Sequence, residues 1–332
     1  MSTLMVSQEL GPILYYYDLY PEKVEDYGKV KKIYTKRGDY ALKQTNIDRE
    51  QADWLVHVAR RLMKLGYRNC VPLIPTKYGE YTITANNKTY YVMPWIYEGE
   101  SKGNIPLERK LMKQMGTIHR LTVKSQAFIK ETIDDSYQVL QQRWDSRRVE
   151  LERFADGAEK RIYMSPFELS FLTHYQHLSA MITGAQQHVK AWYDACLEKE
   201  KYRSVLCHGK LSRRHVLLHE TGEPLLFNFE RASLDCPARD LASFYRHSLG
   251  YTLWDDEEMF RWQEIYEKEL ALFPEEKQLL AGYLHFPDAI IHSVLSYIEK
   301  PANMTELMHV KRMEKRLIAM RKSQRLAQKL IQ

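Results

Sequence analysis

The side chains that could perform acid–base, metal-binding or anion-binding chemistry gather between residues 206 and 242 of the chain. They are His208, Lys210, His215, Asn228 and Asp240. Lysine is protonated at neutral pH, so Lys210 offers hydrogen-bond donors but no lone pair to accept a proton. Mg²⁺ prefers carboxylate oxygens and binds imidazole poorly, and the amide of Asn228 supplies only a neutral oxygen. This set of side chains therefore suits a bare anion better than a divalent metal ion.

The part of the chain before this block has the pattern of a small α+β lobe. Two β-leaning runs around the turn residues 36–39 predict a hairpin over 29–43. An amphipathic helix should follow, with Asn46 or Asp48 as its N-cap and a stop at Gly66. Short strands are expected over 71–76, 80–84 and 89–95. We expect this lobe to cover residues 1–98.

The larger part of the chain, residues 99–303, has mainly helical periodicity. Apolar residues recur every three to four positions over 107–121, over most of 135–200 and again after Asp240. One β-like insert interrupts the helices between residues 205 and 229. Residues 304–332 form a basic amphipathic helix with an apolar stripe. The predicted fold class is α+β and bilobal, with a small β-rich N-lobe and a larger helical C-lobe that carries the 206–242 block.

Composition excludes several classes of protein. With 332 residues, 44% hydrophobic and 28% charged, the chain has the composition of a folded globular protein. Its four cysteines include no C-x-x-C pair, which argues against a zinc module. No apolar run approaches the roughly 18 residues that cross a bilayer. The net charge of +6 lies entirely in the last helix, so we expect no nucleic-acid partner.

The spacing within 206–242 resembles the aminoglycoside phosphotransferase and choline kinase group of protein-kinase-like folds. That group has His-Gly-Asp, four residues, Asn, a strand ending in Ile-Asp-Phe, and Pro-x-x-Asp-Leu-Ala; this chain has LCHGKLSRRH, LLFNFE and CPARDLASF. The resemblance implies that the proton-accepting Asp and the two magnesium ligands are replaced by Lys210, His215 and Asn228. The substitutions add about three units of positive charge, which repel a divalent cation at close range.

The first lobe carries weaker matches to the same group. Ala41-Leu42-Lys43 resembles the Ala-x-Lys whose lysine reaches the nucleotide phosphates, and Glu50 or Asp53 could be its acidic partner. Met93-Pro94-Trp95 falls where the interlobe hinge of the group lies. The resemblance therefore implies a nucleotide cleft that includes Lys43, Met93 and Trp95, although Gly28 is the only glycine where a phosphate-covering Gly-rich loop is expected.

A narrower resemblance combines Ala41-Leu42-Lys43, LGYRNCVPLIPT, YVMPWI and LCHGKLSRRHVLL. These segments resemble the YutH-type endospore coat-associated proteins, the CotS-like branch of this fold. The resemblance implies synthesis in the mother-cell cytoplasm, deposition in the spore coat, and other spore coat proteins as partners. The basic helix 304–332 is either a docking element for an acidic partner or a packed helix with a solvated face.

Each candidate residue also has a structural interpretation. His208 could brace its loop as a core histidine, and Asp240 could be a helix N-cap or loop anchor. Lys43 could be an ordinary half-exposed strand lysine. Glu230, two residues after Asn228, could substitute for the lost metal ligand or be a solvated side chain screened by Arg231.

Three hypotheses about function follow. The preferred one is a catalytically inactive kinase-like protein, a pseudokinase with no cofactor and no bound metal, that has an assembly or scaffolding role in the coat. The second is a working small-molecule phosphotransferase that uses ATP and Mg²⁺, with Glu230 and a non-standard base. The third is a non-catalytic module that binds a nucleotide or another anion through Lys43 and Lys210.

Overall fold

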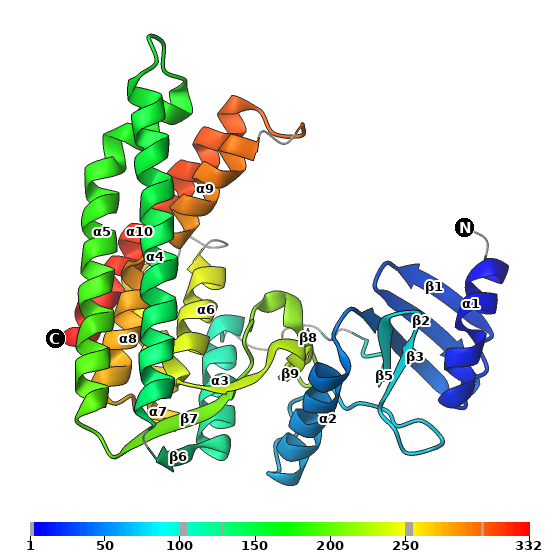
Figure 1. Ribbon diagram of the computed structural model, residues 1–332. Coiled ribbons are helices and arrows are strands. Elements are labelled where there is room, and N and C mark those ends of the chain that lie inside the picture. Colours follow the sequence, from blue (N-terminus) through cyan, green and yellow to red (C-terminus); the bar gives the residue numbers. More distant parts are fainter. Residues whose placement is uncertain (1–2, 98, 100–104, 128, 250–254, 300–301) are drawn as a thin grey trace. The chain divides into compact units, whose positions relative to one another are not determined.

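The computed structural model describes residues 3–97, 99, 105–127, 129–249, 255–299 and 302–332 (Figure 1). Its contacts divide the chain into two compact units. The first contains residues 1–114 and 213–233, and the second contains 115–212 and 234–332. Each unit is built from two separated segments of the chain, so these units do not test a division into consecutive segments. The predicted division into 1–98, 99–303 and 304–332 stays a prediction. No helix in the described ranges has the length and apolar character needed to cross a membrane.

The first unit contains a five-stranded antiparallel sheet in the order β1-β2-β3-β5-β4. The strands are β1 (Lys23–Tyr27), β2 (Val30–Thr35), β3 (Gly38–Thr45), β4 (Thr82–Ala85) and β5 (Lys88–Pro94). The pairing of β2 with β3 confirms the predicted hairpin, in which Gly38 adopts φ +128°. Asn86 and Asn87, both with positive φ, form the tight turn between β4 and β5.

Helix α1 (Thr3–Tyr16) and strand β1 have no counterpart in the predicted elements. Gly11 and Pro12 lie inside α1, where both residues lower helix propensity. The helix forms because Leu10, Ile13 and Leu14 are buried in one hydrophobic cluster with residues of the sheet. Tertiary packing therefore outweighs local propensity at this end of the chain.

Helix α2 (Arg49–Lys64) confirms the predicted amphipathic helix. Asp48 is its N-cap: the side chain accepts a hydrogen bond from the Gln51 backbone N–H, and the Asp48 backbone N–H donates to the side-chain oxygen of Gln51 in a capping box. Gly66 has φ +79° directly after the helix, the left-handed conformation that glycine adopts without strain. In contrast, the strand predicted over 71–76 is wrong. Within this segment Ile74 makes one isolated bridge, to Val92, and Cys70 directly before it makes another, to Leu226.

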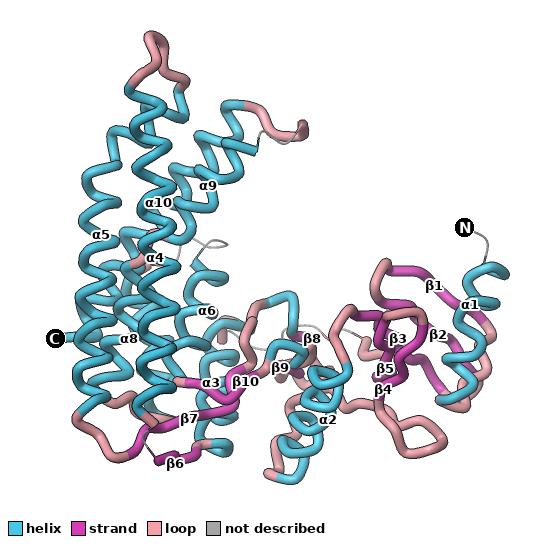
Figure 2. Tube along the Cα trace, viewed as in Figure 1, coloured by secondary structure: helices cyan, strands magenta, loops and turns pink. Residues whose placement is uncertain are grey.

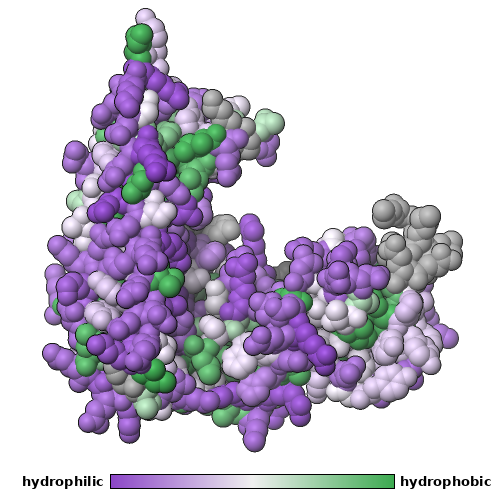
Figure 3. Space-filling model, in the orientation of Figure 1, coloured by the Kyte–Doolittle hydropathy of each residue, from purple (hydrophilic) through white to green (hydrophobic). Residues whose placement is uncertain are grey.

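Helices make up most of the remaining chain (Figure 2). They are α3 (Leu107–Thr122), α4 (Lys130–Glu159), α5 (Pro166–Leu197), α6 (Pro237–Leu249), α7 (Asp256–Glu269), α8 (Pro274–His285), α9 (Asp288–Glu299) and α10 (Glu306–Ile331). In the second unit α5 packs against α4, α8 and α10, with Phe167, Phe171 and Val189 fully buried. The view in Figure 3 shows mainly hydrophilic side chains over α4 and α5, whose apolar residues face the bundle.

Five short strands accompany these helices. β6 (Lys124–Ala127), β7 (Lys201–Cys207) and β10 (Ser233–Asp235) form a three-stranded sheet in the order β10-β7-β6. β8 (Val216–Leu218) and β9 (Pro224–Leu226) form a hairpin in the first unit. The end of β7 together with β8 and β9 confirms the predicted β-like insert over 205–229, whereas β6 and β10 lie outside it. The helical pattern resumes with α6. The observed α+β fold class agrees with the prediction.

Candidate functional site

The ammonium group of Lys43 lies against two residues that follow strand β9. Its Nζ donates a hydrogen bond to Asn228 Oδ1 at 2.5 Å and lies 2.8 Å from Glu230 Oε1. The side chains of Lys43 and Glu230 are only 13% and 16% exposed. All three residues belong to the first unit. Lys43 is therefore a paired, mostly buried lysine, and the half-exposed alternative is wrong.

Glu230 accepts two further hydrogen bonds from the sheet. The Tyr91 hydroxyl donates to Oε1 at 2.8 Å, and the Thr45 hydroxyl donates to Oε2 at 3.1 Å. Tyr91 is the direct cross-strand partner of Lys43, and Thr45 points to the same face of β3 two residues on. Burial opposes ionisation of Glu230, but Lys43 and these hydroxyl groups hold the pKa of its carboxyl group below the usual value. The solvated alternative for Glu230 is therefore wrong.

A short 3₁₀-helix, η2 (Phe229–Arg231), places the Glu230 carboxylate. Asn228 precedes it with φ +69° and ψ +49°, a left-handed conformation that asparagine tolerates better than most residues. The acids expected from α2 do not perform this role: Glu50 and Asp53 are exposed. The partner of Lys43 is thus supplied by a segment far along the chain.

The same face of the sheet carries a second enclosed lysine. Lys32 on β2 lies opposite Ala41, which in turn lies opposite Met93. Its Nζ is 4.8 Å from the ring centre of Trp95 and 4.5 Å from that of Tyr97. Asp39 lies 3.4 Å from the Lys32 ammonium. The structure therefore places Trp95, one of the expected cleft residues, over a buried lysine, and Met93 is itself buried.

The turn between β1 and β2 occupies the place expected for a phosphate-covering loop. It consists of Gly28 and Lys29 alone, because Tyr27 already pairs with Val30. Gly28 has φ +77° and its amide donates to Asp26 Oδ1 at 2.7 Å. Lys31 forms an ion pair with the same carboxylate and donates to the Gly28 carbonyl at 2.8 Å. This is a two-residue hairpin turn closed on itself.

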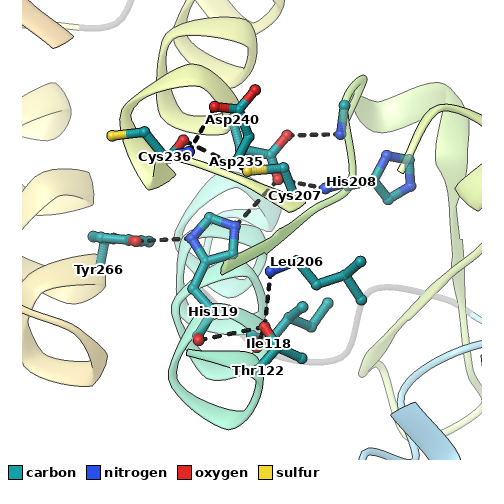
Figure 4. Close-up of polar contacts among 11 residues, drawn as sticks. Ile118, His119, Thr122, Leu206, Cys207, His208, Asp235, Cys236, Asp240 and Tyr266 are labelled. Atoms are coloured by element: carbon teal, nitrogen blue, oxygen red, sulfur yellow. Dashed lines mark hydrogen bonds and ion pairs between the residues drawn. The ribbon is translucent and has the colours of Figure 1, made fainter. Parts of the chain in front are cut away.

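Asp240 is the centre of a separate network in the second unit (Figure 4). The His208 amide donates to its Oδ2 at 2.7 Å, and the Gly209 amide donates to its Oδ1 at 2.9 Å. His119 Nε2 lies 3.3 Å from Oδ2, and His119 Nδ1 lies 2.8 Å from the Tyr266 hydroxyl. The carboxylate at the first turn of α6 thus anchors the backbone that follows β7.

This network is almost completely inaccessible to solvent. His119, His208 and Asp240 are at most 2% exposed. Burial opposes ionisation of Asp240, but hydrogen bonds and charge from His119 and His208 hold its pKa below the ordinary value. Another network contact links α3 to β7: the Leu206 amide donates to Thr122 Oγ1 at 3.0 Å. The arrangement is that of a structural anchor.

His119, Cys207 and Asp240 also place their ligand atoms within 4.8 Å of one another. Burial raises the pKa of the Cys207 thiol well above its usual value, so the thiolate that binds metals is disfavoured. Both nitrogens of His119 already face Asp240 and Tyr266. The donor set is therefore a poor fit for a metal ion.

The predicted site residues fall into two groups. Lys43, His215, Asn228 and Glu230 belong to the first unit, whereas His208, Lys210 and Asp240 belong to the second. The first group brings Lys43, Asn228 and Glu230 into contact, while the His215 ring lies edge-on to Phe227 at 6.2 Å. Sequence reasoning did not identify Tyr91, Thr45 or Tyr266. The signal for Thr45 was its spacing of two residues from Lys43 on β3, which places both side chains on one face. Tyr91 lies opposite Lys43 on β5, a pairing that the sequence pattern does not give.

Comparison with known structures agrees with this architecture. The chain is similar to an aminoglycoside phosphotransferase from Alicyclobacillus acidocaldarius, with a TM-score of 0.76, 17% identity and 95% of each chain covered. It is also similar to the spectinomycin phosphotransferase APH(9)-Ia, with a TM-score of 0.63, 15% identity and coverage of 98% of this chain and 99% of the other. At these identities the similarity establishes the kinase-like fold. No curated protein sequence matches the chain significantly.

A family model covers almost the whole chain. It matches residues 12–330 and is described as "Spore coat putative kinase YutH". The match includes Lys43 and its partners Asn228 and Glu230 as well as the Asp240 network. The chain therefore belongs to the YutH family of spore coat proteins with a kinase-like fold.

Proposed function

We propose that this protein is a catalytically inactive member of the kinase-like fold that acts in assembly or scaffolding of the spore coat. The observation that carries the first half of the proposal is the pairing of Lys43 with Glu230 at 2.8 Å. In protein kinases the corresponding lysine binds the nucleotide phosphates while it is paired with a glutamate of a helix, so an acidic partner alone does not exclude phosphate binding. Here the acidic partner comes instead from the segment after Asn228, and Nζ also donates to Asn228 Oδ1. The ammonium group therefore lies against the position at which the related enzymes hold Mg²⁺.

The chemistry of the other replaced positions supports the same conclusion. Lys210 stands where the related enzymes carry their proton acceptor, and a protonated amine cannot perform that role. Asn228 and His215 stand at the positions where the related enzymes hold Mg²⁺, and neither residue provides a carboxylate. General-base catalysis alone contributes on the order of 10²–10⁴ in rate. Loss of the base and the ligands together removes the main sources of acceleration.

The alternative of an active phosphotransferase requires Glu230 to hold the metal. Its two oxygens already accept from Lys43, Tyr91 and Thr45. A magnesium ion would have to displace these donors and would gain one carboxylate in return. The alternative of an anion-binding module requires an anion to share the Lys43 ammonium group with Glu230 and Asn228.

Helix α10 supports an assembly role. Four of its cations, Lys311, Arg312, Lys315 and Arg321, are exposed, and none of them forms an ion pair with another described residue. Leu307, Met308 and Ile318 are 61%, 47% and 47% exposed on the same helix. We propose that this surface, the α10 basic face, contacts an acidic surface of another coat protein after the chain leaves the mother-cell cytoplasm.

The proposal is tested by transfer of radiolabelled phosphate from ATP with Mg²⁺ to a panel of amino alcohols and sugars. We expect no transfer above that of a heat-denatured sample. We also expect millimolar ATP, with or without Mg²⁺, to leave the unfolding temperature unchanged. Mg²⁺-dependent transfer that is abolished by Glu230→Ala would overturn inactivity. An unfolding temperature raised by ATP without transfer would favour the binding module.

A further inference from the structure

Lys32 lies on the sheet face that also carries Lys43. It pairs directly with Ala41 across β2 and β3, and Ala41 pairs directly with Met93 across β3 and β5. Directly opposed residues of an antiparallel pair point to one face of the sheet, and so do residues two apart on a strand, such as Ala41 and Lys43. Lys32, Ala41 and Met93 therefore form a row across the sheet, next to Lys43.

Three aromatic rings and one carboxylate surround the Lys32 ammonium group. Its Nζ lies 4.3 Å from the ring centre of Tyr34, 4.8 Å from that of Trp95 and 4.5 Å from that of Tyr97. It also donates a hydrogen bond to the Tyr97 hydroxyl at 3.2 Å and lies 3.4 Å from Asp39 Oδ2. Aromatic faces within about 6 Å attract a cation. This aromatic cage therefore compensates the charge of a lysine that is only 6% exposed.

The aromatic cage is held in place by contacts of its own. The Trp95 amide donates to the Asp39 carbonyl at 2.9 Å, and the Tyr97 hydroxyl donates to the Asp39 carboxylate. Strand β3 lies between β2 and β5 in the sheet, so the contact between Lys32 and Trp95 crosses β3. The pairing of β2 fixes the backbone of Lys32, and the cage fixes its ammonium group. The side chain therefore stays over β3.

This place over β3 is the one that the base of a nucleotide would need. Lys43 is the residue expected at the phosphates, so the base would lie at the other end of the expected cleft, toward Met93 and Trp95. Ala41 and Met93 are each only 7% exposed on that side of the sheet. A flat ring that stacked there would have to move the ammonium group away from three rings and a carboxylate.

We infer that Lys32 closes the base end of the expected nucleotide cleft from within the first unit, so that the chain excludes nucleosides. The inference rests on the proposed function, because it concerns the same cleft, and it names the residue that keeps the ligand out. Exclusion at this end does not depend on the charge of Lys43 or on the magnesium positions.

Calorimetric titration of the full chain with adenosine tests this role, because adenosine carries no phosphate. We expect no saturable binding by the parent at millimolar adenosine and saturable binding by Lys32→Ala, at least about tenfold tighter than any binding by the parent. Lys32→Met replaces the charge but still fills most of the space, so it should exclude adenosine as the parent does. Lys31→Ala, on the opposite face of β2, is the matched control and should also behave like the parent.

The unfolding temperature in n-propylammonium chloride shows whether Lys32→Ala is folded with an open cage. This cation reproduces the part of the lysine side chain that the substitution removes. It should raise the unfolding temperature of Lys32→Ala above the value in equal potassium chloride, and it should leave the parent and Lys31→Ala unchanged. A Lys32→Ala protein that responds to n-propylammonium but does not bind adenosine would overturn the inference.

Two further results would also overturn it: saturable adenosine binding by the parent, or equal binding by Lys32→Met and Lys32→Ala. Adenosine binding by the parent without phosphate transfer would refute the closure by Lys32 and leave the proposed inactivity intact. Phosphate transfer by the parent would refute both, since ATP must then enter the cleft. The two failures are therefore distinguishable.

Discussion

The carboxylate of Glu230 lies 2.8 Å from the ammonium group of Lys43, and both side chains are mostly buried. A buried ion pair is stable only when the remaining polar atoms are also satisfied. Here Tyr91 and Thr45 satisfy Glu230, and Asn228 satisfies Lys43. Lys43, Asn228, Glu230, Tyr91 and Thr45 thus form one hydrogen-bonded network within the first unit.

Replacement of Glu230 by alanine should destabilise the protein by about 3 kcal/mol, because Lys43 would keep a mostly buried charge without its carboxylate. Urea unfolding at pH 7 measures this difference. Glu220→Ala, in the exposed turn between β8 and β9, is the matched control and should change stability by less than about 0.5 kcal/mol. A Glu230→Ala protein as stable as the control would contradict the role of the pair.

The contribution of the Glu230 carboxylate to the free energy of unfolding should decrease as the pH falls. The pKa of its carboxyl group is lower in the folded protein than in the unfolded chain. The stabilisation is therefore fully present above the unfolded-state pKa and is lost as pH falls through the folded-state pKa. The stability difference between the parent and Glu230→Gln should be constant from pH 7 to about pH 5 and shrink at lower pH. Urea midpoints of both proteins across this range measure it, and a difference that grew on acidification would refute the assignment.

Asp240→Asn should cost about 3–5 kcal/mol, since it removes a buried charge that accepts from the His208 and Gly209 amides and faces His119. The amide that replaces one oxygen would point a donor at other donors. Thermal or urea unfolding gives the change, and Glu257→Gln on α7, a carboxylate that is 80% exposed, serves for comparison. A loss below about 1 kcal/mol would mean that Asp240 does not anchor the loop.

Reversal of the four charges of the α10 basic face to glutamate should prevent deposition in the coat without unfolding the protein. The affected residues are exposed and form no ion pair within the described ranges, so stability should change little. Fluorescence microscopy of tagged protein in sporulating cells measures deposition. The same number of reversals elsewhere, at Lys36, Lys64, Lys88 and Lys160, controls for net charge. Normal deposition of the α10 variant would reject this face as the docking element.

Local pattern was sufficient for much of the fold. The alternation around Gly38, the cap at Asp48 and the three-to-four-residue period of α3 each act over a few residues, so sequence spacing alone encodes them. The 206–242 block likewise indicated the kinase-like fold and the loss of its catalytic carboxylates. In contrast, α1 contains Gly11 and Pro12 and forms through core contacts, which no local pattern reveals.

The tertiary structure alone decided which residues meet. Glu230 is the partner of Lys43, although Glu50 and Asp53 are much closer in sequence, because the turn after β9 returns to the face of β3. Spacing fixes the direction of a side chain along its own element. The neighbour that it meets depends on how separate elements pack.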